Sequence, residues 1–521
     1  MARRAQPLSG PARAGAALSA LVALAVLGPL LAVALSAEGP GRLGPGDVAA
    51  IRFTLVQAVL SAFLSVAAAI PVARALARRR FAGRRLLVAL MGAPFILPVI
   101  VAVLGLLAIF GRAGWLNAAL EAMGAGAVSI YGLSGIVLAH VFLNLPLAVR
   151  LLLQAWLAVP SERMRLASSL GFSGRDMRRH FERPILKAVL PGAFAIIFLI
   201  CASSFAVALI LGGGPRATTV ELAIYQAFRF DFDLGRAALL GVVQVLICLA
   251  AGLLALGLAR GRDLGEGLDR PALPWPGDRA TARAGDALTI TAAALFLLLP
   301  LLAVVIEGVG AVAGLPPVVW AAALRSVLVA LGSTAATVVL AVPIAIFAAS
   351  RRGSGGVEAV TALSIAVSPL VVGTGLFLIL FPIADPVALA LPVTGFVNAL
   401  VALPFVLRAL IPAVRQAEAG QGRLADALGL TGWPRLRLAI LPRLRRPLGF
   451  GAGLAAAFSM GDLGVIALFS SPGEATLPME MYRLMGSYRT DDAQGAAVLL
   501  LLLALGLFWL FDRGGRVDAA A

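Results

Sequence analysis

The stretch LASSLGFSG at residues 166–174 returns as LADALGLTG at residues 424–432, and this repetition decides the organisation of the chain. The two copies lie 258 positions apart (424 − 166 = 258), about half of the 521 residues. Residues 165–190 and 423–448, aligned at this offset, share ten identities in 26 positions. Chance would give about one or two, so the chain contains an internal duplication. The identical pairs include Arg165/Arg423, Leu166/Leu424, Ala167/Ala425, Leu170/Leu428, Gly171/Gly429 and Pro184/Pro442.

The composition is that of an integral membrane protein. Hydrophobic residues make up 60% of the chain and charged residues 13%, whereas charged residues make up about a quarter of a soluble domain. The mean hydropathy is +0.97. Because about 20 apolar residues cross a bilayer, the sequence predicts an all-α, polytopic fold with twelve spans. We place them near residues 14–37, 53–75, 86–110, 132–157, 186–211, 237–259, 285–308, 323–349, 357–382, 388–413, 446–470 and 495–512.

The net charge of +17 reflects membrane topology. Arginine residues cluster at 78–85, 163–187, 351–352 and 435–446. With twelve crossings and both termini cytoplasmic, all these clusters fall on the cytoplasmic face, as the positive-inside rule requires. This placement argues against nucleic acid as a partner. The first span is longer than the roughly 7–15 residues of a signal-peptide apolar core, so we expect an uncleaved anchor.

Two repeats flank a polar, proline-rich segment. Residues 261–284 form the only long polar stretch between apolar blocks, and we expect a cytoplasmic linker there. It separates a first permease-like repeat at 1–260 from a second at 285–521. Because six spans per repeat is an even number, the repeats are predicted to be parallel, related by an axis along the membrane normal. Pro71 and Pro343 match at an offset of 272 (343 − 71 = 272), so the first repeat carries extra residues, which we place in the external segment 111–132.

The repeated motif predicts two short helices joined by a glycine turn. Leu166 and Leu170 lie on one face of the first helix, with Ser161 as its expected cap and Gly171 ending it in a left-handed turn. Ser173 is expected to cap a second helix that stops near Pro184, and Thr431 and Pro442 repeat this design. Such a helix could simply fold back on its own bundle. Its occurrence twice, with the same glycine-to-proline spacing of 13 (184 − 171; 442 − 429), favours a docking surface for a soluble partner.

The motif resembles the cytoplasmic coupling loop of binding-protein-dependent ABC importer permeases. The pattern of that family is E-A-A, three residues, Gly, nine residues, then I-x-L-P. Here RLA replaces E-A-A in both copies, and the copies end in FERP and AILP. The glycine, its spacing and the terminal proline are kept. Residues 131–171 and 211–231 further resemble thiamine ABC transporter permeases, in which both permease halves are fused in one chain.

This resemblance implies a fold, a function and partners. The implied fold is the all-α importer-permease (MetI-like) fold in a bacterial inner membrane. The implied partners are two copies of a cytoplasmic ABC ATPase subunit on the paired loops and a periplasmic thiamine-binding protein outside. The implied substrate is thiamine, with thiamine phosphates as further candidates, and a fused ferric iron permease is the alternative.

Other classes of membrane protein lack support in the sequence. The only lysine is Lys187, near the start of a predicted span, so a P-loop for ATP is absent and hydrolysis needs a separate subunit. An embedded enzyme would need paired acids or a nucleophile with its base, and a channel would need rings of charge. Neither pattern occurs, and Cys201 and Cys248 are expected to serve packing alone. We therefore expect no catalytic residues, cofactor or metal site.

Four polar residues inside predicted spans are candidates for the translocation path. They are Asp462, its counterpart Ser204 at the 258 offset, Asn144 and His140. An acid in a span usually has a function because its burial is costly. Asp462 could instead cap a helix broken at Gly461 and Gly464, and His140 is expected to form a hydrogen bond between helices.

Overall fold

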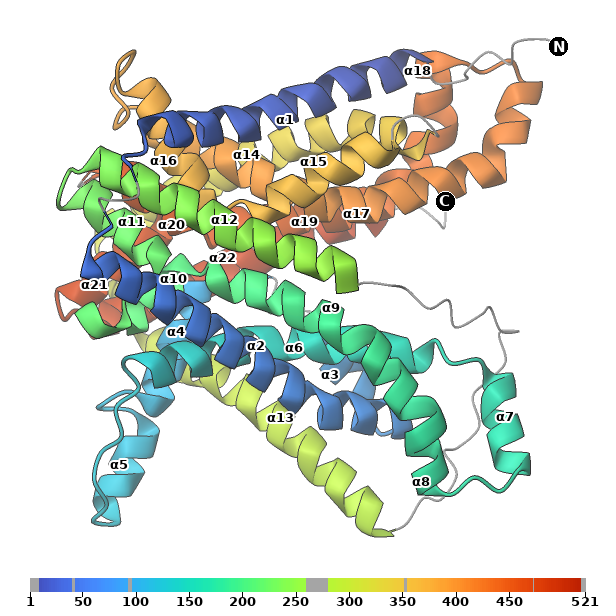
Figure 1. The fold of residues 1–521 in the computed structure, drawn as a ribbon, viewed down its shortest axis with the longest axis horizontal. Helices are drawn as coiled ribbons and strands as arrows, with labels where there is room; N and C mark the ends of the chain where they lie inside the picture. Colours follow the sequence, from blue (N-terminus) through green and yellow to red (C-terminus); the bar gives the residue numbers. More distant parts are fainter. Residues whose placement is uncertain are drawn as a thin grey trace.

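The computed structural model describes residues 9–39, 43–91, 96–258, 280–350, 354–471 and 473–516, and it is helical throughout, without strands in these ranges. Figure 1 shows the helices running roughly side by side along the longest axis. The first half contains α1 (Ser9–Ser36), α2 (Pro45–Arg78), α3 (Arg84–Leu90), α4 (Val99–Phe110), α5 (Trp115–Ala122), α6 (Leu133–Leu157), α7 (Ser161–Ser169), α8 (Gly174–Met177), the π-helical η3 (Arg178–Glu182), α9 (Arg183–Ala202), α10 (Phe205–Leu211), the 3-10 helix η4 (Pro215–Ala217), α11 (Val220–Arg229) and α12 (Leu234–Leu258).

The second half repeats this order. It contains α13 (Ala280–Gly308), the 3-10 helix η5 (Val309–Gly314), α14 (Pro317–Ala349), α15 (Ser354–Ala366), α16 (Pro369–Leu380), α17 (Ala390–Ala427), α18 (Gly432–Arg435), the π-helical η6 (Leu436–Ile440), α19 (Leu441–Met460), α20 (Gly464–Phe469), α21 (Leu477–Gly486) and α22 (Thr490–Arg516). Of the predicted linker 261–284, residues 280–284 form the first turn of α13. The rest lies outside the described residues.

The structure confirms an all-α, polytopic membrane protein. Among the described residues, eleven helices are long and apolar enough to cross a membrane, and the bent pair α15 and α16 would make a twelfth span. The third and ninth predicted spans are not single straight helices. The third consists of α3 and α4 as separate helices, and the ninth turns by 90° between α15 and α16. Pro98 and Pro369 stand at the starts of α4 and α16, where proline is tolerated because no N–H is needed there.

The fifth and eleventh spans are also interrupted, at matching positions. The fifth breaks between α9 and α10 at Ser203 and Ser204, and the eleventh breaks between α19 and α20 at 461–463. Ser204 and Asp462, which correspond at the 258 offset, are both in these breaks. The extra residues of the first half form α5 and the segment that follows it. The equivalent connection between α16 and α17 is only residues 381–389.

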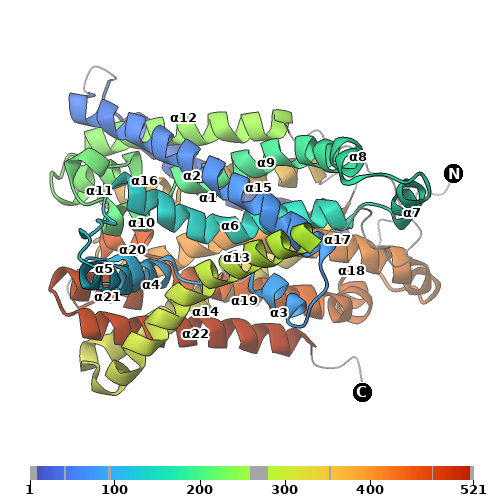
Figure 2. The same cartoon turned by 90° about the horizontal axis from the view of Figure 1, so that it is seen from below.

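The first helix of each half packs against the other half. In both views α1 lies beside α14, α15 and α16, while α13 lies beside α2 and α4 (Figures 1 and 2). Two glycines allow these helices to approach closely. A Cβ at Gly375 of α16 would lie 2.2 Å from the Pro29 carbonyl oxygen, and one at Gly105 of α4 would lie 2.4 Å from that of Pro300. The halves are therefore interlocked by close packing of helix backbones, the contact that stabilises helix pairs in a membrane.

The segments predicted to be cytoplasmic gather at one end of the molecule. Figure 1 shows the beginning of α1, helices α7, α8 and α18, and the end of α12 towards one end. Helices α5, α11 and α21 lie at the opposite end, which Figure 2 also shows. This arrangement agrees with an even number of crossings per half. The face that meets the cytoplasm stays a prediction from the arginine placement.

We predict that the end of the molecule that contains α7, α8 and α18 faces the cytoplasm. Ser173→Cys and Thr431→Cys should resist an impermeant thiol reagent in intact cells and react with it in inverted vesicles, because both side chains lie in exposed turns. The unmodified chain is the control, since Cys201 and Cys248 are both buried. Labelling of either introduced cysteine from outside intact cells would overturn this topology.

Candidate functional site

The paired loops are built around two glycines in the left-handed conformation. Gly171 has φ of 64° and Gly429 has φ of 66°, as the sequence predicted. In the first loop the Gly171 amide donates to the Ser168 carbonyl at 3.1 Å, and the next amide donates to Ala167 at 3.0 Å. The second loop repeats both bonds from residues 429 and 430, at 3.1 and 2.9 Å. This is the complete Schellman arrangement, which satisfies the last carbonyls of a helix and sets the direction of the chain that follows.

Each turn leaves a pair of leucines uncovered, and we call these four residues the leucine stripes: Leu166 and Leu170 in the first loop, Leu424 and Leu428 in the second. Their side chains are 59%, 63%, 59% and 64% exposed, whereas Ala167 and Ala425 between them are 2% exposed. The two copies therefore present the same face outwards. Apolar side chains that stay exposed at matched positions mark a surface for interaction.

The two loops reach this shared shape by different chemistry. In the first loop an apolar cluster of Met164, Ala167 and Met177 holds α7 against α8. In the second loop the counterpart of Met177 is Arg435, whose side chain is 2% exposed. Arg435 donates to Glu418 at 2.6 Å and to Asp426 at 2.5 Å. The guanidinium is buried, while Glu418 and Asp426 are 27% and 65% exposed, so the two acids connect a buried cation with the solvent.

This buried ion pair was missed by the sequence analysis. The signal was a coupled difference between the copies: Met164 and Met177 correspond to Gly422 and Arg435 at the 258 offset. A Cβ at Gly422 would lie 3.1 Å from Nη2 of Arg435. The glycine therefore leaves the space that the longer, charged side chain fills.

Three local predictions for the loops were wrong. Helix α7 begins at Ser161 itself, after Pro160. The second loop has no separate first helix, because α17 continues to Ala427; the counterpart of Pro160 is Glu418, which can donate its N–H within a helix. Thr431 precedes α18 but makes no capping bond, whereas Ser173 does cap α8 by accepting from the Asp176 amide at 3.4 Å.

The second short helix also does not stop at the proline. In the first loop α8 passes through η3 into α9, and in the second α18 passes through η6 into α19. Pro184 and Pro442 each follow the π-helical turn directly, at the second residue of α9 and α19. A wider π turn before the proline accommodates the ring and the missing N–H that would end a regular helix. Each loop is thus joined to a membrane span by continuous helix.

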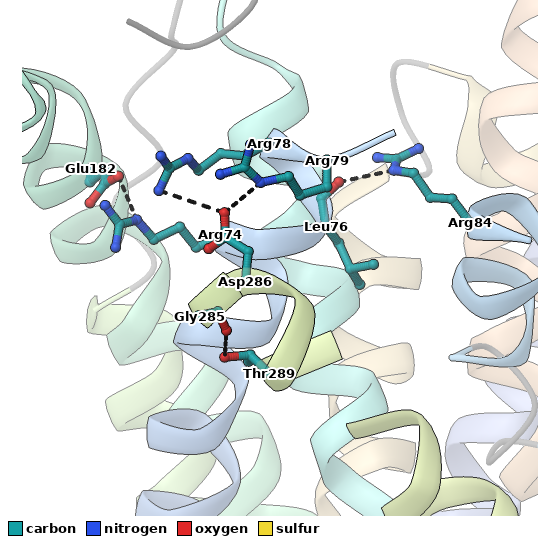
Figure 3. A network of polar contacts seen from close by, with 9 residues as sticks. All are labelled: Arg74, Leu76, Arg78, Arg79, Arg84, Glu182, Gly285, Asp286 and Thr289. Atoms are coloured by element: carbon teal, nitrogen blue, oxygen red, sulfur yellow. Dashed lines mark hydrogen bonds and ion pairs between the residues drawn. The ribbon is translucent and has the colours of Figure 1, made fainter. Parts of the chain in front are cut away.

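A further ionic network joins the first loop to the other half (Figure 3). Arg74 of α2 pairs with Glu182 of η3 at 2.8 Å. Arg79 of α2 pairs with Asp286 of α13 at 2.7 Å, and Arg78 lies 3.9 Å from the same carboxylate. Helix α2 therefore connects the π-helical turn after the first loop with the first helix of the second half.

The predicted path residues separate into two groups. His140 and Asn144 are buried within the first half: Ser61 Oγ lies 3.2 Å from His140 Nδ1, and Asn144 Nδ2 lies 3.4 Å from Cys201 Sγ. The bond between His140 and α2 confirms the expected contact between helices. Ser204 and Asp462 occupy the breaks of the fifth and eleventh spans. A lining role for any of the four stays a prediction. No cluster of three or more metal-binding side chains occurs within the described ranges.

Comparison with known proteins identifies the family. The chain is 42% identical over 477 residues to the thiamine transport system permease protein of Salmonella typhimurium, covering 89% of this chain and 88% of that protein. The Brucella abortus protein of the same name is 41% identical over 530 residues, with 98% and 96% coverage. The Haemophilus influenzae protein is 34% identical over 476 residues, with 88% and 87% coverage. The chain belongs to the thiamine transport system permease family. No family model matches the chain.

Membership of the thiamine transport system permease family fits the site. The similarity extends across both halves, so it includes both loops and both broken spans. The relatives are named as permeases, which agrees with a non-enzymatic membrane subunit. Ferric iron, the alternative drawn from the sequence, receives no support from these relatives.

We predict that the two glycine turns are required for coupling. Gly171→Val and Gly429→Val meet no atom within 4 Å, so their cost is the left-handed backbone alone, about 1–2 kcal/mol. That strain should turn the leucine stripes away, abolish substrate uptake and weaken copurification of the ATPase, while membrane insertion continues.

Gly174→Val is the matched control, because Gly174 is in the same loop, is equally open and has no positive φ. It should retain most uptake. Normal uptake by the Gly171→Val, Gly429→Val double variant would show that these glycines only end helices.

Proposed function

We propose that this chain is the membrane-spanning permease of an ATP-driven importer that passes thiamine to the cytoplasm. The observation that carries the proposal is whole-length similarity to thiamine transport permeases, combined with two loops of matched geometry at one end of the molecule. A periplasmic thiamine-binding protein would deliver the substrate at the opposite end, across a bacterial inner membrane. Both termini would lie in the cytoplasm.

Each loop is proposed to receive one copy of a cytoplasmic ABC ATPase. The equal exposure of the two leucine stripes supports two equivalent docking surfaces. A separate ATPase is required because the single lysine, Lys187, belongs to α9 and is preceded by ERPIL rather than by a phosphate-binding glycine loop. Exposed basic side chains occur near both stripes in the sequence, namely Arg163 and Arg175 in the first loop and Arg423 and Arg437 in the second. An acidic rim on the ATPase would complement them.

The loops are proposed to act as levers. Helix runs without interruption from α8 to Ala202 and from α18 to Met460, so a push on either loop moves a rigid rod. Both rods end at the breaks that contain Ser204 and Asp462. The network of Figure 3 would carry the push on the first loop to α13 as well, through Glu182, Arg74 and α2. Closure of the ATPases would thereby move both halves together.

We predict that transport needs the complete system and selects thiamine. Proteoliposomes that contain this chain, its ATPase and its binding protein should accumulate thiamine when supplied with ATP. Vesicles with the chain alone should neither leak thiamine nor hydrolyse ATP. The same assay with thiamine monophosphate determines whether the chain also carries thiamine phosphates.

Two controls test this assignment. Ferric iron supplied to the same vesicles should not be accumulated, and a P-loop lysine variant of the ATPase should stop uptake. Iron accumulation without thiamine uptake would refute the substrate, and ATP hydrolysis by the chain alone would refute its role as a permease.

A further inference from the structure

Three helix breaks lie close together where the two halves face each other: the break between α19 and α20, the start of α4 and the start of α10. Gly461 lies against the start of α4, because a Cβ at this position would lie 3.2 Å from Pro98 Cα. Gly464 lies against the start of α10, because a Cβ there would lie 3.7 Å from Phe205 Cδ1. These two glycines flank Asp462. Figures 1 and 2 both place α4, α10 and α20 together. Asp462 is therefore at the interface between the halves, beside two interrupted spans of the first half.

The carboxylate of Asp462 is only half satisfied. Its Oδ1 accepts a long hydrogen bond of 3.5 Å from the Val465 amide, as a cap of α20 would. Its Oδ2 is buried and has no hydrogen-bond partner among the described residues. A buried acceptor without a partner is costly, and a carboxylate within membrane spans more so. Capping accounts for one oxygen and leaves the other for a ligand.

Aromatic rings lie on the first-half side of this acid. Phe205 begins α10 directly after Ser204, and its ring is 5.2 Å from that of Tyr225 in an edge-on arrangement. Both rings are buried. Tyr225 also packs edge-on against Phe230 at 5.7 Å. Aromatic faces attract organic cations, and they do so more strongly where water is excluded.

We propose that Asp462, Phe205 and Tyr225 form a transient site for an aromatic organic cation at the interface of the two halves. The inference rests on the proposed function, since thiamine carries a fixed positive charge on an aromatic thiazolium ring. The carboxylate would offset the desolvation of that charge, and the two rings would pack against the flat ligand. Only one half contributes an acid, since the counterpart of Asp462 in the other half is Ser204, and this keeps the site weak enough for release.

The test separates charge from capping. Asp462→Asn keeps an oxygen for the Val465 amide and removes the charge. In the reconstituted transporter it should raise the KM for thiamine about tenfold or more, because the thiazolium ring, which has no N–H to donate, loses its charge attraction to the carboxylate. Stimulation of ATP hydrolysis by the binding protein should stay unchanged. Asp385→Asn is the matched control, since Asp385 also caps its own backbone, at 2.9 Å from the Val387 amide, but is exposed.

A transplanted charge gives the sharper test. Ser204→Asp in the Asp462→Asn background moves the acid to the corresponding break, and it should lower the KM towards that of the wild type. Phe205→Leu should raise the KM severalfold, and Phe205→Trp should not. Wild-type uptake by Asp462→Asn would show that Asp462 is only a cap. Loss of ATPase stimulation together with uptake would show a structural role and equally overturn the site. Failure of the unmodified chain to carry thiamine would instead refute the proposed function.

Discussion

The left-handed turn at Gly171 and Gly429 is the constraint on which the proposed coupling surface depends. Without this turn each helix would continue straight along its axis, and its leucines would not be presented at the same place on the surface. With the Schellman bonds in place, Ala167 and Ala425 face inwards and the leucine stripes face outwards. The chain then returns towards the membrane as one continuous helix in each half. The backbone conformation of two residues thus fixes both the proposed docking face and the direction of the continuous helix that follows it.

Because the halves are interlocked, the two leucine stripes belong to one mechanical unit. Helix α1 lies on the second half and α13 on the first, each seated by a glycine that faces a proline carbonyl. A movement of one loop cannot be confined to its own half. The ion pairs from Glu182 through α2 to Asp286 give the first loop a direct link to α13. The second loop lacks the acid of this link, because Ile440 stands where the first copy has Glu182. Its own ion pairs are internal and join Arg435 to Glu418 and Asp426.

Features that occur in both halves could be predicted from the sequence, whereas most features of one half alone could not. The duplication, the glycine turns and the exposed leucines could be predicted because two copies confirm each other. The break at Ser204 could not, because one or two small polar residues barely disturb an apolar run of about 25 residues. The break at Asp462 was one of two interpretations of the sequence, because Gly461 and Gly464 flank the acid. The packing of α1 and α13 against the opposite halves could not be predicted either, because an apolar helix surface does not specify which helix it contacts. The ion pair of Arg435 was detectable only as a difference between copies, at Met177 and Met164.

The most direct test of the account is site-specific crosslinking from the leucine stripes. A photoreactive residue at position 166 or 424, placed singly in the assembled transporter in native membranes, should form a crosslink to the ATPase from either position with similar yield. Position 123 is a suitable control, because Met123 is 72% exposed and directly follows α5, which lies at the opposite end of the molecule. It should give no ATPase adduct. Crosslinks confined to one loop, or from both stripes back to this chain alone, would contradict the central claim that the paired loops are two equivalent docking surfaces.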